Sequence, residues 1–221
     1  MRNTLGIVLL LLVLLTWFVG IADAQVNKAV CSNQCILPVP VEPGDTLIAM
    51  GIWPLGMTST TIFDPKPNKW EFMGFLNGRT ICVWYALDTV GGAETLTLPP
   101  GMGVEAILVE YPPSSGPDDS SMAMYHDGSG DLVADSNPVT TSVRGDFVIG
   151  LFSSWPTGFA VSGTPDRGYE TTASIGWLTL VDKMAVPKGT YSPSLTYAQP
   201  VLNDVWVIAF KAKANGACKP V

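Results

Sequence analysis

The stretch FVIGLFSSW, residues 147–155, decides the fold class of this protein. In an extended strand successive side chains point to opposite faces. Phe147 and Ile149 therefore share one face, while Val148 and Phe152 share the other. Both faces are apolar, which is typical of a strand in the middle of a packed sandwich.

Six other segments have the same character: each is short, rich in β-branched or aromatic residues, and bounded by Gly, Pro, Asn or Asp. None sustains a helical repeat over several turns. The sequence therefore predicts an all-β protein, a two-sheet antiparallel sandwich with a jelly-roll-like path. The further predicted strands are 46–53, 80–87, 94–98, 104–111, 175–181 and 204–213.

The two halves of the sequence resemble each other. The segment GDTLIA, residues 44–49, is similar to GDFVIG, residues 145–150, and each strand that follows ends in a Trp-Pro pair. Similarly, 104–111 could correspond to 205–212. Any two buried strands look alike, so the sequence favours a chance likeness over a true duplication.

The chain opens with features of a signal peptide. An apolar run over residues 5–21 is followed by Ala22-Asp23-Ala24, the small-x-small pattern of a cleavage site. We expect residues 1–24 to be removed and residues 25–221 to form one secreted or cell-surface domain with no membrane contact. An uncleaved membrane anchor is the alternative, because the run is nearly as long as the roughly 20 residues that span a bilayer.

Composition and charge narrow the range of partners. Charged residues are 14% of the chain and hydrophobic residues 47%, which opposes disorder. The formal net charge is -7 and the basic residues are scattered, so nucleic acid is excluded as a partner and anionic membrane surfaces are disfavoured. Neutral polymers, proteins, cations and other copies of the chain remain.

Four cysteines, Cys31, Cys35, Cys82 and Cys218, allow two disulfides in three connectivities. Cys31 and Cys35 could close a short loop, whereas pairing Cys218 with an N-terminal cysteine would tie the chain ends together. A zinc site is disfavoured because His126 is the only histidine and there is no second close cysteine pair.

Catalytic residues are not predicted. A Ser-His-Asp triad would have to use His126, and Gly128-Ser129-Gly130 lacks the pattern of a nucleophile elbow. Glycoside hydrolysis needs two carboxylates across a cleft, but Glu105 and Glu110 point to opposite faces of an unbulged strand. We therefore expect a protein that is not an enzyme.

One segment resembles a calcium loop, and calcium is the only cofactor that the sequence suggests. Asp127, Ser129, Asp131 and Asp135 place oxygen-bearing side chains at alternate positions. Leu132 stands where a helical calcium loop needs Gly, so that standard loop is excluded. A solvated acidic turn is favoured here, and the same interpretation applies to the acidic pair at residues 118–119.

Aromatic residues form the candidate ligand site, which would stack on sugar rings. Strand ends are where the binding loops of a sandwich gather. Trp84 and Trp206 lie inside apolar strands and are expected in the core instead. The candidate residues are Trp53 and Trp155, which end strands before prolines, with Trp177, Tyr169 and Tyr191.

The order of several short motifs resembles a widespread group of bacterial secreted β-sandwich domains found in surface and adhesion-like proteins. The resemblance implies an extracellular, non-enzymatic role without fixing a ligand. Members of that group commonly have a small residue after the position of Tyr111, where this chain has Pro112-Pro113. The motifs are GDTLIA (44–49), NKW (68–70), VWYA (83–86), GGAETLTL (91–98), VEY (109–111), GDFVIG (145–150) and WVIA (206–209).

The sequence thus predicts a non-catalytic extracellular binding or adhesion module, most plausibly carbohydrate-binding or specific for a cell-surface protein. The alternative is a structural subunit that self-assembles into an envelope layer or extracellular filament. An extracellular hydrolase is the least favoured of the three.

Overall fold

The computed structural model describes residues 27–53, 61–75, 80–98, 105–125, 131–155, 163–165 and 168–214. Within these ranges every regular element is a β-strand, and all paired strands run antiparallel. The predicted all-β, antiparallel fold class is therefore confirmed. The expected signal peptide lies outside the described ranges, and inside them no helix is long and apolar enough to cross a bilayer.

The first half of the chain forms one large and one small sheet. Its strands are β1 (Lys28–Cys31), β2 (Gln34–Ile36), β3 (Thr46–Trp53), β4 (Trp70–Phe75), β5 (Thr80–Ala86), β6 (Thr95–Thr97) and β7 (Ala106–Tyr111). The large sheet has the order β1-β7-β3-β5-β4, so β3 is central. The small sheet pairs β2 with β6, and Phe63 bridges to Thr97 on the other side of β6.

The second half builds another large sheet and its own outer strands. Its strands are β8 (Ser114–Tyr125), β9 (Asp131–Asp135), β10 (Val139–Thr141), β11 (Asp146–Trp155), β12 (Thr164–Pro165), β13 (Glu170–Ile175), β14 (Leu178–Val186), β15 (Gly189–Tyr191) and β16 (Ser194–Ala212). Residues 202–212 of β16 lie in a large sheet of order β8-β16-β11-β14-β13. The first part of β16 pairs with β9 and β12, and β10 pairs with β15.

The two large sheets have the same strand order and equivalent registers. In the first, Ile48 of the central β3 pairs with Val109 of β7. In the second, Ile149 of the central β11 pairs with Ile208 of β16. The edge strands β4 and β13 each carry a bulge opposite the following strand. The five strands of the second large sheet therefore repeat the five strands of the first.

The turn before each central strand is also repeated. Gly44 has a φ of 93° and donates its N–H to the carbonyl oxygen of Thr89 at 2.8 Å. Gly145 has a φ of 96° and donates to the carbonyl oxygen of Val186 at 2.9 Å. Both glycines sit in the left-handed region that favours Gly. The likeness of residues 44–49 to 145–150 is thus a true structural repeat and not a chance similarity.

The outer strands follow the same repeat. Cys35 of β2 pairs with Leu96 of β6, and Ala134 of β9 pairs with Leu195 of β16. A jelly-roll-like path for the whole chain is not confirmed, because each large sheet comes from one half of the sequence. Within each half, the chain alternates between the large sheet and the outer strands.

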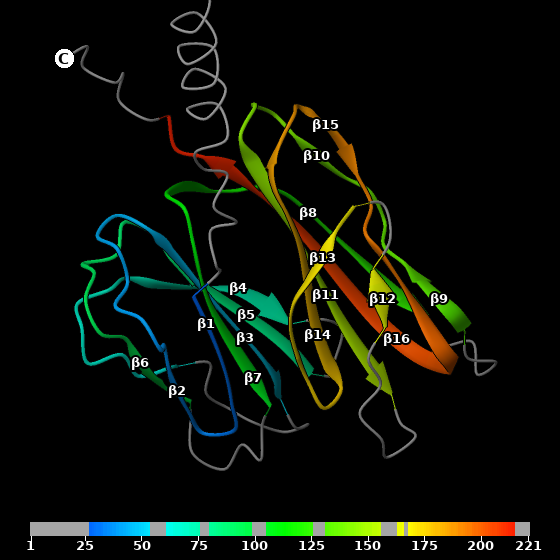
Figure 1. The fold of residues 1–221 in the computed structure, drawn as a ribbon, viewed down its shortest axis with the longest axis horizontal. Coiled ribbons are helices and arrows are strands. Elements are labelled where there is room, and N and C mark those ends of the chain that lie inside the picture. Colours follow the sequence, from blue (N-terminus) through cyan, green and yellow to red (C-terminus); the bar gives the residue numbers. More distant parts are fainter. Residues whose placement is uncertain are drawn as a thin grey trace, which may run out of the picture.

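The large sheets pack face to face, and the outer strands of each half cover the remaining faces. One core cluster unites Ile48, Ile149 and Leu96, and so joins both large sheets to the small β2–β6 sheet. A second cluster, including Val148 and Leu195, lies between the second large sheet and its outer strands. Figure 1 shows the first half, in blue to green, beside the second half, in green to red.

The contact between the large sheets is nearly symmetric. Tyr111 stacks on Phe147, with ring centroids 4.8 Å apart, and Phe147 stacks on Phe210 at 5.1 Å. The Tyr111 hydroxyl group also reaches Asp182, while Phe210 contacts the ring of Tyr85. Since Phe210 and Asp182 are the repeat equivalents of Tyr111 and Tyr85, these two contacts are equivalent. The halves therefore pack about a pseudo-two-fold axis, like an isologous dimer.

One strand prediction is wrong in its course. The sequence predicts one strand over 175–181, whereas Gly176-Trp177 forms a two-residue turn between β13 and β14. Gly176 has a φ of 51°, which such hairpin turns favour. The apolar character of the residues on both sides of the turn conceals the reversal in the sequence.

A second difference concerns the acidic pair Asp118 and Asp119. It lies inside β8 rather than in a solvated turn. The Asp118 carboxylate accepts the N–H of Ser142 at 2.6 Å, and Asp119 accepts that of Thr140 at 2.7 Å. These carboxylates therefore satisfy backbone N–H groups in and just after β10, and so tie β10 to β8.

Candidate functional site

Both central strands end at the same end of the molecule. Thr46, at the start of β3, pairs with Tyr111, and Phe147, near the start of β11, stacks on Tyr111. The two strands therefore leave the same aromatic stack and run away from it together. Their last residues, Trp53 and Trp155, are placed by this geometry at the opposite end.

Trp177 belongs to that end as well. It lies in the turn between β13 and β14, and its carbonyl oxygen accepts the N–H of Ser154 at 2.9 Å. Its own N–H donates to Oε2 of Glu105 at 2.9 Å. Glu105 directly precedes β7, where Ala106 pairs with Gly51 of β3. This chain of contacts links the ends of β3, β7 and β11, and we call the region that carries Trp53, Trp155 and Trp177 the tryptophan end.

Trp177 lies in a turn, whereas Trp53 and Trp155 are the last residues of their strands. Trp177 is half-buried and packs partly against the shared core. For Trp53 and Trp155 the structure describes only the backbone, with Trp53 opposite Thr80 and Trp155 opposite Leu202. The residues that follow each of them in the sequence lie outside the described ranges.

The two predicted tyrosines do not join the tryptophan end. Tyr169 is buried, and the Nζ atom of Lys183 lies 5.5 Å from its ring centroid. Its ring packs in the second core cluster and not on the described surface, so Tyr169 is not placed with the tryptophans. Tyr191 lies in β15 at the other end of the molecule, near the start of β11, and its hydroxyl group donates to the carbonyl oxygen of Pro187 at 2.7 Å.

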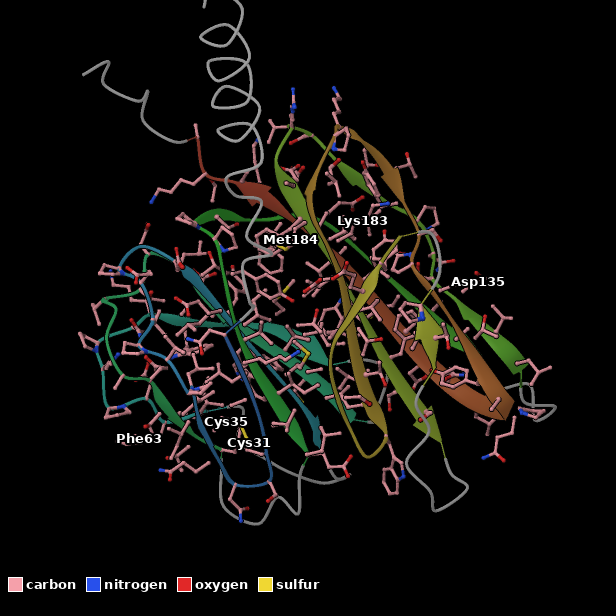
Figure 2. The ribbon with its side chains drawn as sticks, viewed as in Figure 1. Cys31, Cys35, Phe63, Asp135, Lys183 and Met184 are labelled. Atoms are coloured by element: carbon pink, nitrogen blue, oxygen red, sulfur yellow. A yellow bond between two sulfur atoms is a disulfide. The ribbon has the colours of Figure 1, made fainter. Side chains whose placement is uncertain are left out.

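Only two of the four predicted calcium-loop residues lie in the described part of the chain. Asp127 and Ser129 lie outside the described ranges. Asp131 and Asp135 are the first and last residues of β9, which at about 3.3 Å per residue separates their Cα atoms by about 13 Å. Asp135 is exposed, at the far edge of the second half (Figure 2). Among the described residues, no cluster of three or more His, Cys, Asp or Glu could hold a metal ion.

Of the cysteines, Cys31 and Cys35 form a disulfide with a Cα–Cα distance of 5.2 Å (Figure 2). This bond connects β1 of the large sheet to β2 of the small sheet. Cys82 is a buried free thiol in β5, and burial raises its pKa to about 12. Cys218 lies outside the described ranges. Of the pairings that the sequence leaves open for Cys31 and Cys35, the short local bond between them is therefore the one that forms.

A partly buried polar network connects the loop before β4 to the residue before β6, and sequence reasoning did not find it. Oδ2 of Asp64 accepts from Nε1 of Trp70 at 2.7 Å and from Nδ2 of Asn68 at 2.9 Å. Nζ of Lys66 lies 3.2 Å from Oε2 of Glu94, which is fully buried. Burial, with the nearby charge of Asp64, raises the pKa of Glu94 despite this ion pair. The network anchors the loop to β6.

The carboxylates considered for catalysis are engaged in structural bonds. Glu105 accepts a hydrogen bond from the backbone N–H of Trp177. Glu110 accepts one hydrogen bond from Nδ2 of Asn27 at 2.6 Å and another from the N–H of Glu42 at 2.7 Å. His126 lies outside the described ranges. No pair of carboxyl groups in the described part is seen across a cleft.

Comparison with known proteins identifies no relative. No family model, no curated protein and no solved structure matches the chain.

Proposed function

We propose that this protein is a non-catalytic extracellular binding or adhesion module that contacts a polysaccharide or a surface protein through the tryptophan end. The observation that carries the proposal is the convergence of Trp53, Trp155 and Trp177 at one end of the two packed sheets. Aromatic rings at strand ends offer large, rigid contact area, and the loops of a sandwich gather at such ends.

Compartment and charge support the same role. A local disulfide between Cys31 and Cys35 is typical of oxidising compartments and fits export behind a signal peptide. The net charge of -7 and the scattered basic residues favour neutral ligands over polyanions. The likeness of the short motifs to secreted domains of surface and adhesion-like proteins points to the same role.

The test is a glycan-array screen combined with pull-downs on insoluble cellulose and chitin, with and without calcium. Retention by any of these probes is then compared among Trp53→Ala, Trp155→Ala and Trp177→Ala. Tyr191→Ala is the matched control, because it removes a partly exposed aromatic ring at the other end. The proposal requires that the tryptophan variants lose retention while the control keeps it and all variants stay folded.

A second candidate is self-assembly as a subunit of an envelope layer or filament, and one observation favours it. The outer face of the β2–β6 sheet exposes two large apolar side chains, Ile36 at 60% and Phe63 at 63%. Phe63 lies on the side of the first half that faces away from the second half (Figure 2). Exposed apolar side chains that share one sheet face are a feature of protein contact surfaces.

Sedimentation velocity over a range of protein concentrations distinguishes this candidate from a monomeric module. Self-assembly predicts larger particles as concentration rises, and Phe63→Ser removes them. Val133→Ser is the control, because Val133 is an exposed residue on the outer strand β9 of the other half. A constant sedimentation coefficient for the wild type contradicts the structural role.

A further inference from the structure

Two prolines form the whole connection between the halves of the chain. The first half ends with β7 at Tyr111 and the second begins with β8 at Ser114, so only Pro112 and Pro113 lie between them. In the described part of the chain, every strand pair and every β-bridge joins two segments of the same half. No sheet in that part therefore crosses from one half into the other.

Side-chain packing and a few polar contacts hold the halves together. In the core, the Tyr111 hydroxyl group donates to Asp182 at 3.0 Å. At the surface, Lys213 forms an ion pair with Asp88. The disulfide between β1 and β2 lies within the first half and so does not tie it to the second. A second half from another copy of the chain could make each of these contacts with the same geometry.

Each half covers its own outer face but not its inner face. Ile48 of the first large sheet and Ile149 of the second belong to one buried cluster between the sheets. The cluster on the outer face of the second large sheet, which contains Val148 and Leu195, is made of second-half residues alone. Each half therefore needs a partner half, from this chain or from another copy, to remove its inner apolar face from water.

The repeat shows the conformation of the connecting segment in another context. Because Tyr111 corresponds to Phe210, the connection 112–113 corresponds to residues 211–212. In the second half β16 continues as one extended strand over both of these residues. In the first half the strand ends and the chain bends at Pro112. The bend is thus a feature of the connection and not of the repeated fold.

The sequence of the connection favours a straighter path than this bend. The proline ring fixes φ, and a residue that precedes a proline is biased toward extended backbone. Tyr111 and Pro112 both precede a proline. Since β7 and β8 lie in different sheets, a straight connection moves the second half away from its own first half. Both inner faces then become accessible to a second copy.

We propose that two copies of the chain exchange their second halves through a straightened connection 112–113 and so form a dimer. Each first half then packs against the second half of the other copy, with the contacts of the monomer. Exchange of an identical element is a low-cost route to a dimer, and a connection this short favours it. The exchange uses neither the tryptophan end nor the outer face of the β2–β6 sheet, so it is independent of both functions proposed above.

The ion pair between Lys213 and Asp88 reports which chain supplies each half, because one partner lies in each half and both are exposed. Unlabelled and isotope-labelled whole protein are mixed in urea, refolded at high concentration and separated into monomer and dimer by gel filtration. A carbodiimide then joins Lys213 to Asp88, and mass spectrometry identifies the two linked peptides. The dimer is expected to yield mixed pairs, with one labelled and one unlabelled peptide, and the monomer only uniform pairs.

The connection is tested by changing its prolines. Pro112→Gly with Pro113→Gly removes the bias toward a straight path and should raise the dissociation constant of the dimer by about tenfold. Pro65→Gly with Pro67→Gly is the matched control, because these prolines lie in the loop before β4, and it should leave the constant unchanged. The exchanged dimer should also persist in Phe63→Ser, which distinguishes it from assembly through the outer face.

A wild type that refolds only to the monomer overturns the exchange. A dimer that yields only uniform pairs, or whose dissociation constant is the same in the Pro112→Gly, Pro113→Gly variant, overturns it as well. If that variant does not fold, the label pattern of the wild-type dimer decides.

Discussion

The Tyr111 hydroxyl group donates a 3.0 Å hydrogen bond to Oδ2 of Asp182 and so joins the two halves of the chain across the core. Asp182 also accepts from the hydroxyl group of Thr172, and both partners are buried. The equivalent contact, between Tyr85 and Phe210, is a pair of aromatic rings. The interface between the repeats therefore combines one polar and one apolar version of the same contact.

Tyr111→Phe should lower the free energy of unfolding by about 1–3 kcal/mol, because it leaves the buried Asp182 without one of its donors. Urea unfolding at pH 7 measures this loss. Tyr85→Phe is the matched control, because its hydroxyl group bonds Glu71 on an exposed part of the surface, and it should change stability by less than about 0.5 kcal/mol. Equal losses in the two variants would contradict a role for the buried bond.

Stability should decrease as pH rises from 5 to 8. Burial is the largest cause of a raised pKa at Asp45, Glu94 and Asp182. A carboxyl group with a raised pKa binds its proton more tightly in the folded chain, so its contribution is full below the unfolded pKa near 4 and is lost as pH passes through the folded pKa. At Asp118 burial opposes ionisation, but hydrogen bonds from Ser142 outweigh it and lower the pKa, which acts in the opposite direction.

Urea midpoints measured between pH 5 and pH 8 test this profile. For Asp45 the window is bounded by its ordinary pKa of 3.8 and the folded value of about 7, so Asp45→Asn should flatten the decline across that range. A stability that rises steadily toward pH 8 would show that the buried carboxyls are stabilised by charge instead.

Gly176→Ala should destabilise the protein far more than Gly44→Ala. Both glycines have positive φ, so both variants carry a backbone cost of about 1–2 kcal/mol. A Cβ atom at Gly176 would lie 1.7 Å from Oε1 of Glu105, whereas no atom lies within 4 Å of a Cβ atom at Gly44. Because the Glu105 carboxylate must move away from the new Cβ atom and lose its hydrogen bond from the Trp177 N–H, we expect an additional loss of about 1–2 kcal/mol for Gly176→Ala. Glu105→Ala in the same chain should recover part of it, and similar unfolding curves for the two glycine variants would argue against this contact.

Removal of the local disulfide by Cys31→Ser with Cys35→Ser should cost about 2 kcal/mol, the amount expected for a loop this short. The measurement is urea unfolding of the variant beside the oxidised wild type.

The Cys82 thiol should resist alkylation in the native protein, because it is buried and its pKa is about 12. Peptide mapping that finds rapid labelling of Cys82 without denaturant would contradict this placement.

The sequence predicts the central strands well, because their signals are local. The segment 46–53 matches β3, because Gly44 forms the turn before the strand with a positive φ and a run of mostly apolar residues follows from Leu47. Polar strands are missed: β8 contains SSGPDDSS, which has the composition of a turn. Its extended conformation depends on pairing with β16, which no local pattern encodes.

The candidate site is predictable only in part. The Trp-Pro pairs identify the two strand ends, and Trp177 reaches the same end through Glu105, which is remote in sequence. Tyr169 could not be assigned to the core, since its burial depends on how the outer strands cover the second large sheet.

Retention on glycan arrays and on insoluble cellulose and chitin, measured for the wild type, Trp155→Ala and Tyr191→Ala, tests the central claim most directly. The account predicts specific retention of the wild type and of Tyr191→Ala, with loss in Trp155→Ala at unchanged thermal stability. Equal retention of Trp155→Ala and the wild type, or no retention of the wild type by any probe with or without calcium, would contradict a glycan-binding tryptophan end.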